Sequence, residues 1–177
     1  MPHRLRPYLH IFNQWDSSIC IRVNRSSQYG WVRHLFRIVS WLGDGVFWYS
    51  LMLGILIVQG PSGLRSVLHM LLVGLTCLIS YKWLKRKTLR PRPYEVHQDV
   101  WLAGRPLDRF SFPSGHTLHA VAFSMVALAY YPQLYWLVMP FTMLVAFSRV
   151  VLGLHYPSDV LAGALIGFLI AQATLMY

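Results

Sequence analysis

Five long apolar segments recur along this chain, and they constrain its fold more than any other feature. Each approaches the length of about 20 residues that a helix needs to cross a bilayer. Together they make the chain 55% hydrophobic and only 12% charged, whereas about a quarter of the residues in a soluble domain are charged. We therefore expect an all-α fold, a polytopic membrane helical bundle of about five transmembrane helices. The segments cover residues 38–59, 67–83 with an extension to about Gly63, 116–131, 134–154 and 160–177.

The first 37 residues have a different character, because six arginines alternate there with aromatic and aliphatic residues. This mixture favours an arm that lies on the membrane surface, with a flexible basic tail as the alternative. We expect a basic aromatic interfacial arm over residues 1–37 and a transmembrane domain over residues 38–177, with no cleavable signal peptide. The arginines are Arg4, Arg6, Arg22, Arg25, Arg33 and Arg37.

Glycine and proline punctuate the apolar segments. The turn sequence Gly60–Gly63 should join the first two segments into an antiparallel hairpin. Asp44 stands between two glycines near the start of the first segment, which indicates a helix cap or a surface polar group rather than a catalytic residue. A stripe of small residues at every fourth position of the last segment predicts close helix packing. The stripe consists of Gly163, Gly167 and Ala171.

The basic residues gather at one end of the predicted bundle. With five crossings, the arm, the polar loop between Lys82 and Arg109 and the corner at residues 149–159 share one face. Of the 16 Lys and Arg residues, only Arg65 belongs to the opposite face, so the positive-inside rule predicts a cytoplasmic site face in a bacterial inner membrane. Basic residues at membrane borders fit anionic lipid head groups or phosphate, and we expect no nucleic-acid partner.

The corner between the fourth and fifth segments concentrates polar chemistry. Charged groups at the edge of apolar segments are costly unless they have a function. Pro157 suits the first turn of a helix, which would bring Asp159 within hydrogen-bonding reach of His155. A carboxylate that holds one ring nitrogen as N–H leaves the other free as a base or nucleophile. An interfacial histidine beside an aspartate that complements the helix dipole is the alternative for this corner alone.

A second stretch, Phe112–His116, precedes the third segment. Ser114 is a typical N-cap, and Gly115 would let a bound group approach the backbone N–H groups, as phosphate does at helix N-termini. His116 would stand beside that anion, and we interpret His119 as a packing or supporting residue. An ordinary capped helix start is the alternative for this stretch alone.

Three cations complete a possible phosphate site, because Lys85, Arg92 and Arg149 fall on the same face and together describe an oxyanion cradle. No carboxylate and histidine cluster has the spacing of metal ligands, so we expect no metal and no cofactor. The two cysteines, Cys20 and Cys77, support neither a disulfide framework nor a metal site.

These residues resemble the three-part signature of the type 2 phosphatidic acid phosphatase (PAP2) superfamily. Its parts are Lys85 with Arg92-Pro93, then Pro113-Ser114-Gly115-His116, then Ser148-Arg149 with His155 and Asp159. The resemblance implies that His155 attacks phosphorus, Asp159 orients it and His116 acts as general acid. It also implies that Lys85, Arg92, Ser114, Gly115 and Arg149 hold the phosphate oxygens. Members of the superfamily usually have a first crossing where this chain has the basic arm.

The predicted function is therefore a metal-independent membrane phosphatase that acts on a lipid phosphomonoester or a prenyl diphosphate. Undecaprenyl pyrophosphate, phosphatidic acid and phosphatidylglycerophosphate remain open as substrates, and the partners expected are this substrate and the bilayer. A non-catalytic lipid-phosphate binder or transporter is the alternative class. A vanadium haloperoxidase would share these residues, but five apolar segments oppose the soluble bundle that it requires.

Overall fold

The computed structural model describes residues 6–176, with side chains from Asn13 onward. The predicted contributions of Arg4, the side chains of Arg6, Tyr8 and Phe12, and the residue Tyr177 lie outside this description. The described part contains helices and loops and no strand, which confirms the all-α prediction. The helices are α1 Arg6–Asn24, α2 Gly30–Trp41, α3 Phe47–Gln59, α4 Leu64–Thr88, α5 Pro93–Val96, α6 Gly115–Tyr130, α7 Tyr135–Val151 and α8 Pro157–Leu175.

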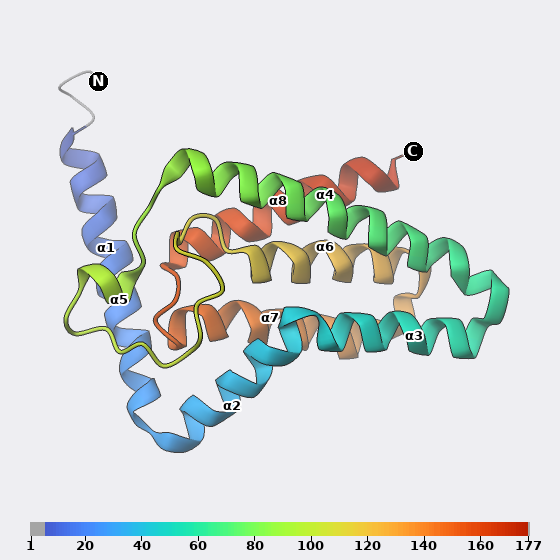
Figure 1. The fold of residues 1–177 in the computed structure, drawn as a ribbon, viewed down its shortest axis with the longest axis horizontal. Coiled ribbons are helices and arrows are strands. Elements are labelled where there is room, and N and C mark those ends of the chain that lie inside the picture. Colours follow the sequence, from blue (N-terminus) through green and yellow to red (C-terminus); the bar gives the residue numbers. More distant parts are fainter. Residues whose placement is uncertain (1–5, 177) are drawn as a thin grey trace.

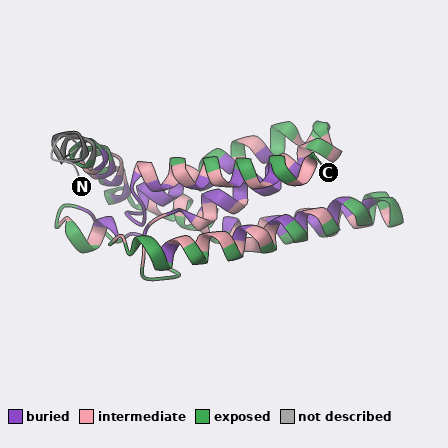
Figure 2. Ribbon diagram, turned by 90° about the horizontal axis from the view of Figure 1, so that it is seen from above, coloured by how far each residue is buried: buried purple, intermediate pink, exposed green. Residues whose placement is uncertain are grey.

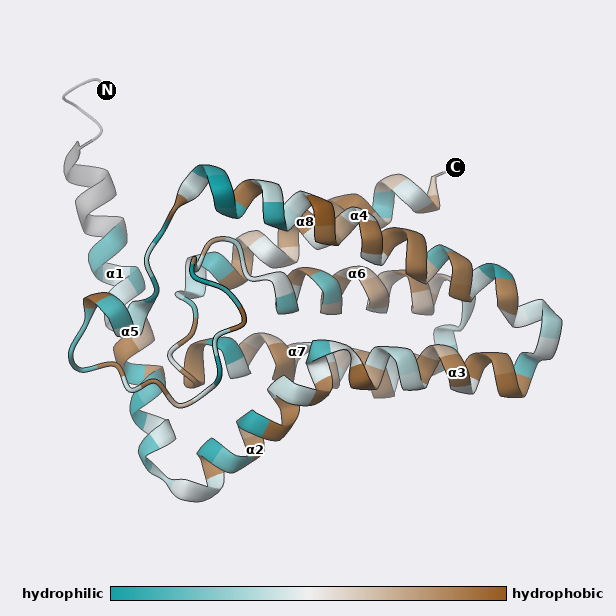
Figure 3. Ribbon diagram, in the orientation of Figure 1, coloured by the Kyte–Doolittle hydropathy of each residue, from teal (hydrophilic) through white to brown (hydrophobic). Residues whose placement is uncertain are grey.

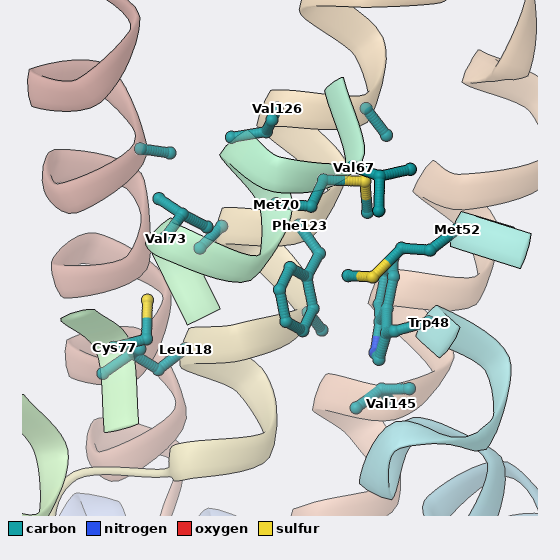
Figure 4. Close-up of a cluster of buried hydrophobic side chains, with 14 of the residues drawn as sticks. Trp48, Met52, Val67, Met70, Val73, Cys77, Leu118, Phe123, Val126 and Val145 are labelled. Atoms are coloured by element: carbon teal, nitrogen blue, oxygen red, sulfur yellow. The ribbon is translucent and has the colours of Figure 1, made fainter. Parts of the chain in front are cut away.

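The long helices α3, α4, α6, α7 and α8 run along one direction, and α1 lies across one end of them (Figure 1). Helix α6 is central, because it packs against α4, α7 and α8. The buried core around it includes Trp48, Phe123 and Val126, with the Trp48 and Phe123 rings 5.4 Å apart (Figure 4). The short helix α5 and the loop that leads to α6 lie at the same end of the bundle as α1 (Figure 1).

The five predicted apolar segments correspond to α3, α4, α6, α7 and α8. By length and composition alone, three helical stretches of the described chain are able to span a membrane: Gly30–Val96, Pro132–Val151 and Pro157–Leu175. The first is a continuous run that contains both α3 and α4, whereas α6 has 16 residues. The arrangement fits the prediction of about five crossings.

The outer surface of the bundle is apolar. Inward faces of the helices are buried and outward faces are exposed (Figure 2), yet the exposed residues include Ile57, Val58 and Trp136, which are 74%, 79% and 83% exposed. Soluble monomers rarely leave so much contiguous apolar surface in water. Hydrophilic residues concentrate instead at the end where α1, the end of α4 and the loop to α6 lie (Figure 3). The chain is therefore a multi-pass membrane protein with one polar end.

The predicted turn at Gly60–Gly63 has the expected position, and glycine also interrupts the helix at Leu42–Val46. Gly60–Gly63 forms a tight helical turn between α3 and α4, with Gly60 at φ 58°. Between α2 and α3 the helix is interrupted at Leu42–Val46, where Asp44 and Gly45 leave the helical conformation and Gly45 has φ 124°. A positive φ of this kind favours glycine because it has no Cβ. The predicted first apolar segment, residues 38–59, therefore begins in the last turn of α2 and continues after the interruption as α3.

Helices α6 and α8 touch through their backbones. A Cβ on Gly163 would lie 2.5 Å from the Ser114 carbonyl oxygen, and one on Gly167 would clash with the Leu118 carbonyl oxygen. The Ser114 N–H also donates to the Asp159 carbonyl oxygen at 3.0 Å. The small-residue stripe thus packs α8 against α6, as predicted.

The N-terminal arm is attached to the polar end by side-chain hydrogen bonds to backbone groups of the polar end. The Asn24 side chain donates to the carbonyl oxygens of Trp101 and Val151 at 3.0 and 2.9 Å, and it accepts from the Trp101 N–H at 2.8 Å. Arg37 donates to the Ala103 carbonyl oxygen at 2.5 Å. The division of the chain at residue 37 stays a prediction, and that residue lies inside α2.

Candidate active site

A cavity of about 360 Å³ opens at the polar end of the bundle. Six of the eight predicted site residues line it: Lys85, Arg92, Gly115, His116, Arg149 and His155. The other two, Ser114 and Asp159, are buried behind its wall. At its other end the cavity is apolar, with Trp48, Leu71, Leu75, Leu78 and Phe123 as lining residues. One cavity therefore combines a cationic end with a hydrophobic end.

His155 is placed by the turn between α7 and α8. Gly153 follows α7 with φ 72°, and a Cβ there would lie 2.6 Å from the Trp101 carbonyl oxygen, so only glycine fits. The N–H groups of Leu154 and His155 both donate to the Arg149 carbonyl oxygen, at 3.0 and 3.1 Å. Such bonds satisfy carbonyls at a helix C-terminus. Since α8 then begins at Pro157, His155 is fixed between two helix ends.

The two ring nitrogens of His155 face different groups. Nδ1 lies 3.7 Å from Asp159 Oδ2, and Nε2 lies 3.5 Å from Arg92 Nη1 on the cavity side. The Nδ1 distance is too long for the hydrogen bond predicted from sequence, and Nδ1 has no hydrogen-bond partner among the described residues. Burial lowers the pKa of His155 well below its ordinary value, and the charges of Arg149 and Arg92 lower it further. The lowered pKa favours the neutral imidazole, and Nε2 is the ring nitrogen nearest to Arg92, which also lines the cavity.

Behind His155 lies a closed group of ion pairs, which we call the rear cluster: Asp16, Arg90, Ser158 and Asp159. Arg90 donates to Asp159 Oδ1 at 2.6 Å and to Asp16 Oδ2 at 2.7 Å. The second Asp159 oxygen accepts from the Tyr156 N–H at 2.9 Å. Each Asp159 oxygen thus accepts a hydrogen bond from a group other than His155. Asp159 is fully buried and Asp16 is 5% exposed.

In front of His155 lies a second group, the front cluster: Lys85, Arg92 and Asp108. The Lys85 ammonium donates to Asp108 Oδ1 and Oδ2 at 2.6 and 2.7 Å, and to the Phe110 carbonyl oxygen at 3.0 Å. Arg92 Nη2 donates to Asp108 Oδ1 at 2.9 Å. Two of the three predicted cradle cations are therefore paired with one carboxylate of the loop. Sequence reasoning did not single out Asp108.

The third cradle cation, Arg149, forms no ion pair with any carboxylate in the part of the chain that the structure describes. Its guanidinium is 1% exposed and donates through Nη1 to the Ser40 hydroxyl. Its Nε has no hydrogen-bond partner among the described residues. A buried guanidinium with an unsatisfied donor at the cavity wall is prepared to bind an oxyanion, because a lone buried charge is costly.

His116 lies in the first turn of α6, close to Asp44, whose side chain is 44% exposed, as the surface alternative predicted. Asp44 Oδ1 lies 3.4 Å from His116 Nε2, and both residues line the cavity. The aspartate caps neither neighbouring helix with its side chain. It acts as the partner of His116, which sequence reasoning missed because 72 residues separate the two. His119, as predicted, has a supporting position, where its ring nitrogens contact the carbonyl oxygens of Gly115 and Gly74 at 2.8 and 3.2 Å.

Ser114 is the N-cap of α6. Its hydroxyl accepts from the Thr117 N–H at 3.4 Å and exchanges a hydrogen bond with the Thr117 hydroxyl at 2.9 Å. It lies outside the cavity lining, whereas Gly115 belongs to it. The N–H groups in the first turn of a helix have no intrahelical partner. The helix start therefore presents its backbone to the cavity, and the Ser114 hydroxyl supports the helix start.

The composition offered one signal for the acidic site residues that sequence reasoning missed. The chain has only six Asp and Glu, and four of them, Asp16, Asp44, Asp108 and Asp159, pair with cationic or histidine side chains at this end. Among the residues that the structure describes, no three His, Cys, Asp or Glu side chains gather closely enough to hold a metal ion.

The profile of the PAP2 superfamily matches residues 63–177 of this chain. The chain belongs to the PAP2 superfamily. The match includes all three parts of the signature and the helices α4, α6, α7 and α8 that carry them. The resemblance predicted from Lys85, His116, His155 and their neighbours is thereby confirmed at the level of the family.

Named relatives and solved structures agree with this membership. The chain is 30% identical over 120 residues to undecaprenyl-diphosphatase BcrC of Bacillus subtilis, an alignment that covers 68% of this chain and 62% of that relative. The solved structure of Aquifex aeolicus LpxE is 26% identical with a TM-score of 0.77, over 90% of this chain and 94% of the other. A PAP2-type phosphatidylglycerolphosphate phosphatase from Bacillus subtilis is also 26% identical, with a TM-score of 0.71, over 94% and 85% of the two chains.

Proposed function

We propose that this protein is a metal-independent phosphatase that removes the terminal phosphate of a membrane lipid through a phosphohistidine intermediate. One observation carries the proposal: His155, with Nε2 beside Arg92, lines a cavity that is cationic at one end and apolar at the other. A neutral imidazole beside Arg92 and Arg149 is suited to attack phosphorus, because the cations offset the charge of the phosphate oxygens.

In the first chemical step, His155 Nε2 forms a bond to phosphorus while the bond between phosphorus and the leaving oxygen breaks. Lys85, Arg92, Arg149 and the N–H groups at the start of α6 would hold the three remaining oxygens. His116 would donate its proton to the leaving oxygen. Asp159 stabilises the charge that His155 gains, since the two are 3.7 Å apart.

In the second step, a water molecule attacks phosphorus and the bond between phosphorus and His155 breaks. His116 takes the proton of that water, which returns it to the acid form, and inorganic phosphate leaves. Asp44, which lies 3.4 Å from His116 Nε2, is placed to stabilise the protonated imidazole before the first step and after the second. The Ser114 hydroxyl supports this geometry as the cap of α6.

The apolar end of the cavity supports an amphiphilic substrate. Trp48, Leu71, Leu75 and Phe123 line this end, and α3 and α4 carry exposed apolar residues on their outer sides. A hydrocarbon chain attached to the leaving oxygen would stay in apolar surroundings while its phosphate reaches His155. Soluble phosphate esters would gain nothing from this surface.

Among lipid phosphates, a second cavity favours diphosphates. It has a volume of about 500 Å³, shares Asp44, Leu107 and His116 with the first, and adds Arg37 and Arg105. In a diphosphate the leaving group is itself a phosphate, and guanidinium groups next to the general acid would stabilise its charge. The name of the Bacillus subtilis relative, an undecaprenyl-diphosphatase, supports the same substrate class.

The orientation in the membrane remains part of the proposal. Of the 16 Lys and Arg residues, only Arg65 belongs, by its position in the sequence, to the end of the bundle opposite the site. We infer from the positive-inside rule that the site faces the cytoplasm of a bacterial inner membrane. A reporter fused after Tyr177 would then appear on the periplasmic side, and a cytoplasmic reporter would reverse the assignment.

The test is release of inorganic phosphate by the purified full chain in detergent, with a chelator present. Prenyl diphosphate, prenyl monophosphate, phosphatidic acid and phosphatidylglycerophosphate form the substrate panel. The control pair consists of His155→Ala and His34→Ala, because His34 is exposed on α2 away from the cavity. We expect release by the wild type and by His34→Ala, and a decrease of at least about 10³-fold for His155→Ala.

The result that opposes the proposal is equal release by the wild type and His155→Ala. Binding of phosphate without release from any lipid would favour the second class of function, a lipid-phosphate binder or transporter. Such a protein needs the cations but not a nucleophile backed by a carboxylate. Peroxide-dependent halide oxidation would instead indicate haloperoxidase chemistry.

A further inference from the structure

Asp108 occupies the place that the proposed mechanism gives to phosphate. Its two oxygens take two of the three Lys85 ammonium hydrogens, and the Phe110 carbonyl oxygen takes the third. One of the same oxygens also accepts from Arg92 Nη2 at 2.9 Å. A carboxylate with both oxygens bound by cations imitates two oxygens of a phosphate group. Phosphate therefore has no free Lys85 donor unless Asp108 leaves.

The burial of the three groups differs, and this decides which of them moves. The Lys85 and Arg92 side chains are 8% and 1% exposed, whereas the Asp108 side chain is 36% exposed. Lys85 is part of the long helix α4, and Arg92 also donates to the carbonyl oxygens of Asp108 and Leu154. Asp108 belongs to a bend of the loop between α5 and α6. The cations are fixed, so exchange requires only movement of the loop.

When no phosphate is bound, the three cations at the cavity need a negatively charged counter-ion. Lys85, Arg92 and Arg149 line one cavity, and buried cations without counter-ions destabilise a fold. Asp108 supplies one negative charge from within the chain. A terminal phosphate supplies up to two and also reaches Arg149, so it can replace the carboxylate. A phosphodiester, with one negative charge, has a smaller advantage over the resident aspartate.

We propose that Asp108 is a resident competitor for the phosphate site: it stabilises the empty site and is displaced by the terminal phosphate of the substrate. This inference rests on the proposed function. The same competition weakens binding of the inorganic phosphate product, because Asp108 re-enters the cradle as phosphate leaves. Asp108 thus lowers the affinity of the site for phosphate by competing with phosphate for the cations, and it takes no part in bond formation.

The experiment compares Asp108→Asn with Asp99→Asn. Both aspartates lie in the loop before α6, but Asp99 is exposed and outside the cavity lining. Asparagine preserves the shape of the side chain and removes its charge. The measurements are the dissociation constant of orthophosphate, by calorimetry with the full chain in detergent, and the KM and kcat for prenyl diphosphate.

For Asp108→Asn we expect the dissociation constant of orthophosphate and the KM to fall about tenfold, a change of about 1.4 kcal/mol. The kcat should stay equal or fall, because product leaves more slowly. Without phosphate the variant should unfold at a lower temperature than the wild type, and added phosphate should raise its unfolding temperature by more. Asp99→Asn should match the wild type in every measurement.

An unchanged or raised dissociation constant of orthophosphate for Asp108→Asn would overturn the inference. If Asp108 only anchors the loop, Asp108→Asn will bind orthophosphate equally or more weakly, and Asp108→Glu, which retains the charge, will restore the wild-type value. The proposed function and the inference about Asp108 are contradicted by different results. Wild-type protein that releases no phosphate from any lipid contradicts the proposed function, while tighter orthophosphate binding by Asp108→Asn still identifies the competitor.

Discussion

The rear and front clusters contain the same chemistry in different surroundings. In each, an aspartate receives hydrogen bonds from an arginine at 2.6 to 2.9 Å. Asp159 in the rear cluster is fully buried and joined by a second aspartate, while Asp108 in the front cluster is 36% exposed on a loop. In the proposed mechanism, the ion pair with the buried carboxylate therefore fixes the proposed nucleophile, and the pair with the more exposed carboxylate serves as an exchangeable contact.

The largest expected effect comes from removing the cation of the rear cluster. Arg90→Ala leaves Asp16 and Asp159 as unpaired buried carboxylates, and loss of one partner of such a pair costs about 3 to 5 kcal/mol. We expect a large decrease in the unfolding temperature in detergent. Arg86→Ala, an exposed cation of the same region, is the control. A stable Arg90→Ala variant would show that the rear cluster is no more rigid than the front one.

The next effect concerns the carboxylate behind the nucleophile. Asp159→Asn keeps an oxygen for the Tyr156 N–H but no longer stabilises a charged His155. We expect kcat to fall about 10²-fold, about 2.7 kcal/mol in activation free energy, less than for a carboxylate in direct hydrogen bond to a catalytic histidine. Steady-state kinetics and the orthophosphate dissociation constant separate the two roles. A changed dissociation constant with unchanged kcat would place Asp159 among the binding residues instead.

A smaller effect should follow from Lys85→Met in the front cluster. Methionine fills similar space without charge, and Arg92 continues to hold Asp108 at 2.9 Å. We expect kcat/KM to fall about tenfold, about 1.4 kcal/mol, and the unfolding temperature to change little. Thermal unfolding and kinetics of the same preparation provide the measurement. Unfolding as severe as that of Arg90→Ala would remove the distinction between the two clusters.

The smallest effect is the pH dependence of stability through Asp108. Burial alone would raise the pKa of its carboxyl, but the hydrogen bond and charge of Lys85, with the charge of Arg92, hold that pKa below its usual value. A lowered pKa in the folded state stabilises the protein above the unfolded-state pKa of about 3.9, and this contribution is lost as the pH falls through the folded-state pKa. Solvent screening keeps it to about 1 kcal/mol or less.

The corresponding measurement is the unfolding temperature of the wild type and Asp108→Asn between pH 7 and pH 3. The two curves should lie apart from pH 5 to 7 and approach each other toward pH 3. A constant separation throughout this range would mean that the ionised carboxylate contributes nothing to stability.

The sequence predicted those parts of the molecule that depend on local pattern. Apolar length located α3, α4, α6, α7 and α8, and turn residues located Gly60–Gly63 and the start of α8 at Pro157. Pairing between distant charged residues was not predictable in the same way. The bond between Arg90 and Asp16 joins positions 74 residues apart, and no periodicity connects them. The available signal was the small number of acidic residues. With only six Asp and Glu in the chain, each one is a candidate for a specific pairing.

Contact between α6 and α8 is made by main-chain atoms, since Gly163 rests against the Ser114 carbonyl oxygen. Ser114 immediately precedes the helix that carries His116, and Asp159 and Gly163 share the helix that follows His155. The spacing between the proposed nucleophile and the proposed acid is therefore set by contact between main-chain atoms rather than by adjustable side-chain rotamers. One methyl group at position 163 would push the starts of α6 and α8 apart and leave every side chain of the site intact, so the proposed catalysis depends on the width of one gap between two backbones.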